Sequence, residues 1–257
     1  MKPGTGRIYI SRLPSPYRRP VQAMCRRILR QYPNTAAFVV IGSVADGSWA
    51  PDSDADLVWV ISGRRRKKWH DELDYDYEGV VELVTMNLTS LKEEFAQHSP
   101  MSRSIQRGIV LYDPRGIMAR LRQVRLGPPT REWMDKWWSF FSHRLDWGMD
   151  SYRQARRMHR RFCRDRCTCQ ITEVLTRAVV NLARVLLATE GVVAISKAGM
   201  RPVSPAVLRG PRLREAMEIA LKAHHEKRDL ALPEAAELAY LGRWLRKRLA
   251  GILGQPA

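Results

Sequence analysis

The chain has 257 residues, enough for one large domain or two small ones, each with its own hydrophobic core. Apolar residues make up 45% and charged residues 27% of the sequence, as is usual for globular proteins. No apolar run reaches the roughly 18 to 20 residues of a membrane-spanning helix. The first residues do not resemble a secretion leader, and four clustered cysteines do not make a disulfide framework. We therefore expect a soluble, cytoplasmic protein without a membrane partner.

The charge balance is the extreme feature of the composition. The chain has 44 Lys and Arg against 26 Asp and Glu, a formal net charge of +18. Residues 1 to 115 hold 17 basic and 13 acidic side chains, whereas residues 116 to 257 hold 27 and 13. Such a field attracts polyanions, so nucleic acids, nucleotides or an acidic protein are favoured as partners. A basic surface that serves only solubility is the alternative.

Alternating helix and strand patterns run through the first part of the chain. Apolar residues recur at helical spacing from Pro20 to Leu29. Short β-branched and aromatic runs predict strands over residues 38–41, 57–61, 80–86 and 109–112. Four strands with few helices predict an α/β or α+β domain, which we expect to cover residues 1–115.

The pattern changes after residue 114, where strand alternation ends and long helical periods begin. Residues 116–257 are therefore expected to form a separate, basic helical bundle. Helices are predicted over residues 117–124, 130–163, 172–190, 211–227 and 233–253, with an interruption of the second helix near Gly148.

The segment from Phe38 to Val60 carries the residues that point to chemistry. A predicted strand ends in Gly42-Ser43, and Asp54 and Asp56 enter the next strand about ten residues later. Residues two apart on a strand project to the same face, so the two carboxylates lie side by side and repel each other. Hard oxygen ligands in this arrangement suit Mg²⁺ carrying the phosphates of a nucleotide.

Glu82 adds a third carboxylate inside the otherwise apolar strand of residues 80–86. A lone charge in such a strand is costly without a partner, and beside the preceding strand it would complete a cluster with Asp54 and Asp56. Three carboxylates can hold two metal ions or accept a proton from an attacking hydroxyl. Gly42 lets the backbone approach a phosphate closely, and Ser43 can donate a hydrogen bond to it.

This stretch resembles the signature of the polymerase β-type nucleotidyltransferase superfamily over about residues 35–113. The motif is Gly-Ser, then Asp-x-Asp, then an acidic residue on a later strand. The resemblance implies a mixed sheet with flanking helices. It also implies that Ser43 contacts the triphosphate, that Asp54 and Asp56 bind two Mg²⁺ ions, and that Glu82 is the third carboxylate. The two-part layout is similar to that of kanamycin and other aminoglycoside nucleotidyltransferases.

The sequence departs from the family pattern at three positions, and the resemblance also suggests a catalytic base in the helical part. Relatives often carry arginine at the positions of Val44, Asp46 and Ala50, so a phosphate-facing cation must come from elsewhere or be missing. In the kanamycin enzyme family the base for the acceptor hydroxyl comes from the helical domain, at a distance along the chain that matches Asp150. Asp146 lies one helical turn before it, and both could instead pair with neighbouring arginines.

Seven arginines lie between residues 153 and 166. Their spacing puts most of them along one side of a helix, where phosphate groups are natural counter-ions. The candidates for nucleic-acid or phosphate contact are Arg153, Arg156, Arg157, Arg160 and Arg164. A solvated helix face and contact with the triphosphate of the donor are the alternatives.

We therefore predict an enzyme that moves a nucleoside monophosphate from an NTP to an acceptor hydroxyl or phosphate and releases pyrophosphate. The charge favours RNA, such as a tRNA end, as the acceptor. A small hydroxylated molecule of the aminoglycoside type and a protein side chain are alternatives. A catalytically inactive module that binds nucleic acid or protein is the rival of another class. Neither the donor base nor an oligomeric state can be read from the residues.

Overall fold

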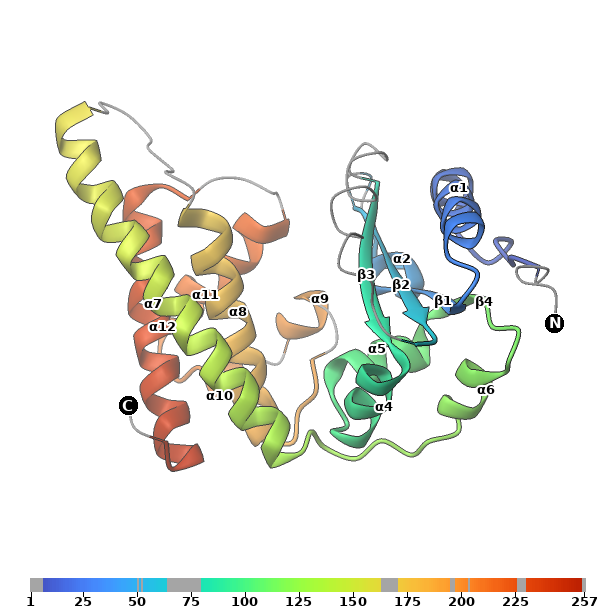
Figure 1. Ribbon diagram of the computed structural model, residues 1–257. Helices are drawn as coiled ribbons and strands as arrows, with labels where there is room; N and C mark the ends of the chain where they lie inside the picture. Colours follow the sequence, from blue (N-terminus) through green and yellow to red (C-terminus); the bar gives the residue numbers. More distant parts are fainter. Residues whose placement is uncertain are drawn as a thin grey trace. The chain divides into compact units, whose positions relative to one another are not determined.

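The computed structural model describes residues 7–49, 51, 53–63, 80–162, 171–194, 197–202, 204–225 and 230–255. The chain divides into two compact units, Met1–Gly127 and Pro128–Ala257. Each has hydrophobic clusters of its own. The mixed sheet and the helical second part confirm the predicted fold class (Figure 1). Within the described ranges, no helix has both the length and the apolar content to cross a membrane.

A four-stranded mixed sheet forms the centre of the first unit. Its strands are β1 (Thr35–Ile41), β2 (Ala55–Ile61), β3 (Val81–Asn87) and β4 (Ile109–Tyr112), in the order β3-β2-β1-β4. β1 pairs antiparallel with both β2 and β4, whereas β2 and β3 are parallel. All four strands lie where the sequence predicted them, within three residues at each end.

Helices pack against both faces of this sheet. Helix α1 (Ser15–Gln31) covers one face, where its apolar side joins Phe38, Leu57 and Trp59 in a buried cluster. Cys25 of α1 lies in this cluster, and burial raises the pKa of its thiol far above the ordinary value. Helices α4 (Leu88–Ala96) and α5 (Pro100–Arg107) supply Leu91, Phe95 and Ile105 to a second cluster on the other face.

Helix α6 (Ile117–Leu121) belongs with the first unit. Its Met118 is buried in the same cluster as Val39 and Val58. The backbone N–H groups of Ile117, Met118 and Ala119 donate to the carboxylate of Asp113, which caps the helix. The first compact unit therefore ends at Gly127. The sequence placed the domain boundary between residues 115 and 116.

The described part of the second unit contains helices and no strands, as expected. Helix α7 (Arg131–Phe162) packs on α8 (Ile171–Thr189), and α11 (Pro211–His225) and α12 (Leu232–Leu253) complete the packing around α8. Two short helices, α9 (Lys197–Met200) and α10 (Ser204–Val207), lie between α8 and α11 in the chain. The expected interruption near Gly148 is wrong, because α7 continues through it. A Cβ at Gly148 would lie 3.3 Å from the Cα of Leu175, so this glycine allows close packing of α7 on α8.

Gly108, just before β4, gives a test of the packing around the sheet. A Cβ at this position would lie 2.6 Å from the carbonyl oxygen of Val40 and from Cγ1 of Val39. We expect Gly108→Ala to destabilise the chain by about 1–3 kcal/mol, because backbone cannot yield as a side chain can. Urea unfolding measures the shift.

Gly251 in α12 is the control, because nothing lies within 4 Å of a Cβ built there. Gly251→Ala should stabilise the helix by about 0.5–1 kcal/mol, since alanine loses less conformational freedom on folding. An unfolding midpoint of Gly108→Ala equal to that of the unchanged chain would contradict the close approach.

Candidate functional site

The first contact of the site joins Gly42 to Asp56. Gly42 follows the last residue of β1 with a φ of +72°, and Ile41 before it is the register partner of Asp56 on β2. A Cβ on Gly42 would lie 2.2 Å from Oδ2 of Asp56. The half-buried carboxylate of Asp56 thus lies against the bare Cα of Gly42. Only glycine allows both this φ and this contact.

Glu82 lies beside Asp56 in the sheet. The two residues are register partners in the parallel pair of β2 and β3, so their side chains leave the same face. Val58, Val60 and Val84 share that face and pack in the cluster beneath α4 and α5. Asp54 lies two residues before Asp56, in the segment that leads into β2. Asp56 and Glu82 therefore continue an apolar face at the end where β2 and β3 begin.

The environment of Glu82 differs from the sequence-based expectation. Its side chain is exposed, at the second position of β3, so it is not the costly buried charge that the apolar run suggested. Among the residues that the structure describes, no three His, Cys, Asp or Glu side chains are gathered as metal ligands. The donor set itself suits a hard divalent cation, because it consists of carboxylate oxygens from adjacent positions. The roles of Asp54, Asp56 and Glu82 as metal ligands stay a prediction.

Ser43 and the short helix α2 (Gly42–Asp46) follow directly. Ser43 is half-buried, and its proposed contact with a triphosphate also stays a prediction. The structure explains two of the three departures from the family pattern. Val44 is buried in the cluster under α1 and so cannot face a phosphate. Asp46 accepts hydrogen bonds from the backbone N–H and the hydroxyl of Ser48, which closes the turn after α2. Ala50 lies outside the described residues.

Tyr17 holds the segment that leads into β2. Its hydroxyl donates a 2.8 Å hydrogen bond to the carbonyl oxygen of Ser53, the residue before Asp54. The ring of Trp49 meets the Tyr17 ring edge to face, with centroids 5.5 Å apart. Helix α1 is thereby tied to both ends of the turn that precedes the carboxylates. Sequence reasoning missed this positioning residue, because a tyrosine in the first turn of a helix carries no distinguishing signal.

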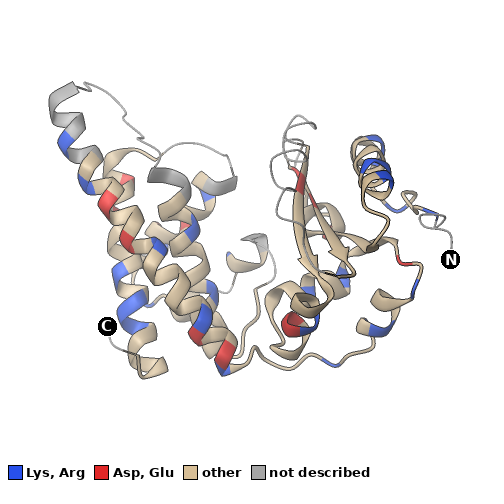
Figure 2. Ribbon diagram, in the orientation of Figure 1, with Lys and Arg blue, Asp and Glu red and all other residues tan. Residues whose placement is uncertain are grey.

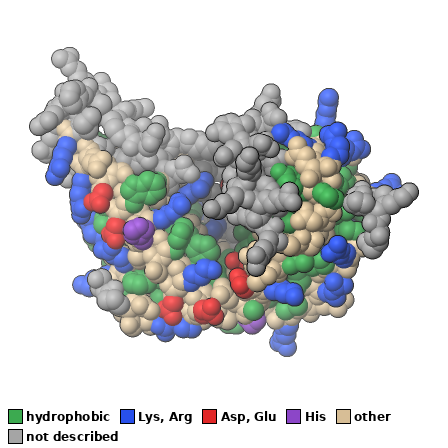
Figure 3. Space-filling model, viewed as in Figure 1, with side chains coloured by type: hydrophobic (Ala, Val, Ile, Leu, Met, Phe, Trp, Pro, Cys, Tyr) green, Lys and Arg blue, Asp and Glu red, His purple; other side chains and the backbone are tan. Residues whose placement is uncertain are grey.

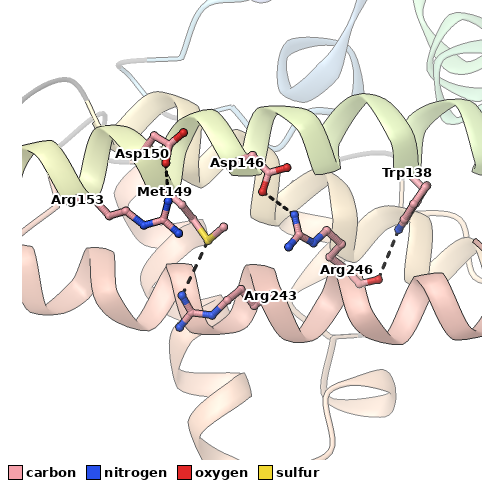
Figure 4. A network of polar contacts seen from close by, with 7 residues as sticks. All are labelled: Trp138, Asp146, Met149, Asp150, Arg153, Arg243 and Arg246. Atoms are coloured by element: carbon pink, nitrogen blue, oxygen red, sulfur yellow. Dashed lines mark hydrogen bonds and ion pairs between the residues drawn. The ribbon is translucent and has the colours of Figure 1, made fainter. Parts of the chain in front are cut away.

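The acidic residues considered for base catalysis lie on α7 in the second unit (Figure 4). Asp150 accepts a hydrogen bond from Arg153 of the same helix at 2.5 Å, and Asp146 accepts one from Arg246 of α12 at 2.5 Å. The side chains of Asp150 and Asp146 are 60% and 52% exposed, so both can be reached from solvent. Asp150 pairs with a neighbouring arginine of its own helix, as the alternative interpretation expected, whereas the partner of Asp146 comes from α12 and was not expected.

The arginines predicted to contact phosphate are only partly visible. Arg153 and Arg157 are exposed on α7, and Arg153 is engaged by Asp150. The helix runs through Arg156 and Arg160, whose side chains lie outside the described residues, as does Arg164 as a whole. The basic run at residues 64–68 also lies outside them. Contact of these arginines with nucleic acid stays a prediction.

Comparison with known families agrees with the geometry of the first unit. Residues 23–105 match the family described as "Nucleotidyltransferase domain". The match runs from α1 to α5 and includes β1, β2, β3, Gly42, Ser43 and the three carboxylates. No curated protein sequence matches the chain at a significant level.

The similarity in fold to one solved structure extends over both units. Spectinomycin adenyltransferase AAD(9) from Enterococcus faecialis, solved with ATP and spectinomycin, matches with a TM-score of 0.53 and 14% sequence identity. The match covers 90% of this chain and 97% of that one. A nucleotidyltransferase-like protein from Exiguobacterium sibiricum matches with a TM-score of 0.39 and 13% identity, over 91% of this chain and 77% of that one.

Substitution of Gly42 tests the arrangement around Asp56. We expect Gly42→Ala to lower the affinity for ATP, measured by calorimetry with Mg²⁺ present, by at least about tenfold. The added Cβ would displace the Asp56 carboxylate and strain a left-handed residue.

Gly47 is the matched control, because it is also left-handed, with a φ of +83°, but has nothing within 4 Å of a built Cβ. Gly47→Ala adds only backbone strain and should change the affinity for ATP little. Equal losses in the two variants would mean that the contact with Asp56 does not matter.

Proposed function

Because this chain carries a nucleotidyltransferase domain of the polymerase β-like superfamily, we propose that it transfers AMP from ATP to a hydroxyl group of a small, aminoglycoside-type molecule. The observation that carries the proposal is the extent of the match to the spectinomycin adenyltransferase. It spans almost the whole of both chains and so includes the helical unit as well as the domain with the carboxylates. A similarity restricted to the nucleotidyltransferase domain would not favour one acceptor over another.

In the proposed reaction, an oxygen of the acceptor attacks the α-phosphorus of ATP. The bond between the α-phosphorus and its bridging oxygen to the β-phosphate breaks, and pyrophosphate leaves. The proton of the acceptor hydroxyl goes to a carboxylate, for which Asp150 is our candidate. Ser43 donates to a phosphate oxygen of the donor, and Gly42 keeps Asp56 in place beside it. These residues align donor and acceptor for in-line transfer.

Asp54, Asp56 and Glu82 are the residues that would hold Mg²⁺. When bound, the cations neutralise phosphate charge and stabilise the attacking and leaving oxygens. The register of Asp56 with Glu82 supports this assignment, because it directs both carboxylates to one face of the sheet, and Asp54 lies two residues before Asp56 in the chain. Val44 and Asp46 provide no cation next to the phosphates, so neutralisation falls to these bound ions and to arginines elsewhere in the chain.

RNA is the second candidate acceptor, and the net charge of +18 is the observation that favours it. A polyanionic acceptor would gain from that field, whereas an aminoglycoside-type molecule would not. A protein acceptor and an inactive binding module have no comparable support. The proposal ranks the small molecule first because it accounts for the match of the helical unit.

Transfer of label separates the acceptors. The full chain is incubated with Mg²⁺ and each α-labelled NTP, in turn with spectinomycin and other aminoglycoside-type antibiotics, with total RNA and with protein. We expect label from ATP on a small molecule, together with one pyrophosphate for each transfer. Label on RNA alone would replace the proposed acceptor, and ATP binding without any transfer would favour the inactive module.

Asp56→Asn provides the chemical control for this assay. It should lower the transfer rate by at least about a hundredfold, since loss of a metal-binding carboxylate removes several kcal/mol of transition-state stabilisation. Glu93→Gln removes an exposed carboxylate from α4 of the same unit and should leave the rate unchanged. Transfer that survives Asp56→Asn would show that the activity does not use this site.

Asp150 and Asp146 form a matched pair for testing the base, because each accepts a 2.5 Å hydrogen bond from an arginine. We expect Asp150→Asn to lower kcat by about 10²- to 10⁴-fold, the usual contribution of a general base. Asp146→Asn should keep kcat, and equal effects of the two substitutions would refute the role of Asp150.

A further inference from the structure

The N-terminal part of the chain carries an unusual charge pattern. The first 45 residues contain eight Lys and Arg and no Asp or Glu. Helix α1 alone has five arginines, and Figure 2 shows blue and no red along it. In Figure 3, Lys and Arg side chains gather at the upper right, over the region of α1. This field lies in the first unit, whereas the candidate arginines from the sequence lie in the second.

A groove of about 860 Å³ lies between α1 and the segment before it. We call it the α1 groove. Its lining consists of Arg7, Ile8, Tyr9, Ile10 and Ser11 on one side and Gln22, Arg26, Leu29 and Arg30 of α1 on the other. Three arginines are among these residues, and none of the described residues that line the groove is acidic.

Hydrogen bonds hold the wall opposite α1 in place. The backbone N–H of Tyr9 donates to the carbonyl oxygen of Leu111 on β4 at 2.8 Å. Arg18 of α1 donates to the carbonyl oxygens of Ser11 and Leu13. Ile8 and Ile10 pack against the buried cluster under α1, whereas the alternate residues Arg7 and Tyr9 are exposed. Hydrogen bonds thus hold this wall of the groove at Tyr9 and Ser11.

The charged groups of the α1 groove are available to a ligand. Arg26 and Arg30 are exposed, lie one helical turn apart, and make no ion pair or hydrogen bond with any residue that the structure describes. The guanidinium of Arg7 lies 5.9 Å from the centroid of the Tyr9 ring, and Tyr9 is 57% exposed. Free guanidinium groups bind phosphate oxygens strongly, and an exposed aromatic ring can stack with a base.

The α1 groove is separate from the candidate active site. Arg26 follows Tyr17 by nine residues, or two and a half helical turns, so it projects from the opposite side of α1. Tyr17 faces the turn before Asp54, as its bond to Ser53 shows. The groove shares no residue with the carboxylate site, and a ligand there would not occupy the place of the donor nucleotide.

We propose that the α1 groove binds a single-stranded polynucleotide, with phosphates at Arg7, Arg26 and Arg30 and a base stacked on Tyr9. An extended, open, acid-free groove with one exposed ring suits a charged strand with planar bases. An anionic membrane is less suited, because Tyr9 is the one large apolar side chain of this face among the exposed ones in the described residues. The proposal stands apart from the proposed transfer reaction and does not depend on its acceptor.

Fluorescence anisotropy of the full chain with a labelled 20-nucleotide single-stranded RNA tests the proposal. The variant Arg7→Gln/Arg26→Gln/Arg30→Gln should lose at least about tenfold in affinity at moderate salt. The slope of log affinity against log salt should fall by about 2, because a single strand releases about 0.7 counterion for each phosphate contact. Tyr9→Leu should weaken binding about tenfold through lost stacking, and Tyr9→Phe should restore it.

The control variant Arg209→Gln/Arg214→Gln/Arg248→Gln removes the same charge from exposed positions of the second unit. It should change affinity less than threefold. Equal losses of RNA affinity in both triple variants would mean that net charge alone explains the binding, which would overturn the proposal. If ATP or pyrophosphate displaces the RNA at low concentration, the ligand of the groove is a free phosphate compound and not a polynucleotide strand, and the proposal is wrong. Binding to phosphatidylserine vesicles in place of RNA would also overturn it.

Asp56→Asn keeps these outcomes distinct from those of the transfer assay. It should leave RNA affinity unchanged, because Asp56 does not line the α1 groove. Failure of the transfer assay would therefore leave the groove proposal intact, and failure of RNA binding would leave the transfer reaction intact.

Discussion

The candidate site depends on the contact between the carboxylate of Asp56 and the bare backbone of Gly42. That contact exists because the antiparallel register of β1 and β2 places Asp56 opposite Ile41, and because the chain turns into α2 at a residue without a side chain. The parallel register of β2 and β3 then brings Glu82 next to Asp56. The sheet register thus places Asp56 and Glu82 side by side, and Asp54 comes from the segment directly before β2. This arrangement suits a site that must hold acidic groups close together despite their repulsion.

Much of this arrangement could be predicted from the sequence, because it rests on short-range patterns. The strands have β-branched runs, and the spacing from Gly42 to Asp54 and Asp56 is a motif of the family. Helices α4 and α5 were not predicted, although Asn87 and Ser99 cap them by accepting hydrogen bonds from Ser90 and Ser102. Their apolar residues are few, so periodicity alone does not distinguish them from a loop.

Other features depend on which residues meet after folding. Glu82 is exposed at the second position of β3, although the apolar run around it suggested a buried charge. Gly148 looked like a helix breaker, yet the backbone of Leu175 needs the room that it leaves. Composition placed most of the positive charge in the second part, whereas the α1 groove arises where the segment at residues 7–11, bonded to β4 through Tyr9, lies beside α1. Hydrophobic periodicity is a local pattern, so it does not predict which distant residues come into contact after folding.

The hydrophobic clusters of the two units have no residue in common: one cluster lies wholly after residue 132, and the other two lie wholly before residue 127. Changes in the helical unit can thus accumulate without disturbing the packing that supports Gly42, Asp56 and Glu82. The sequence of one unit can therefore diverge while the buried contacts of the other are preserved. Low sequence identity to a protein of the same architecture is an outcome that this independence permits.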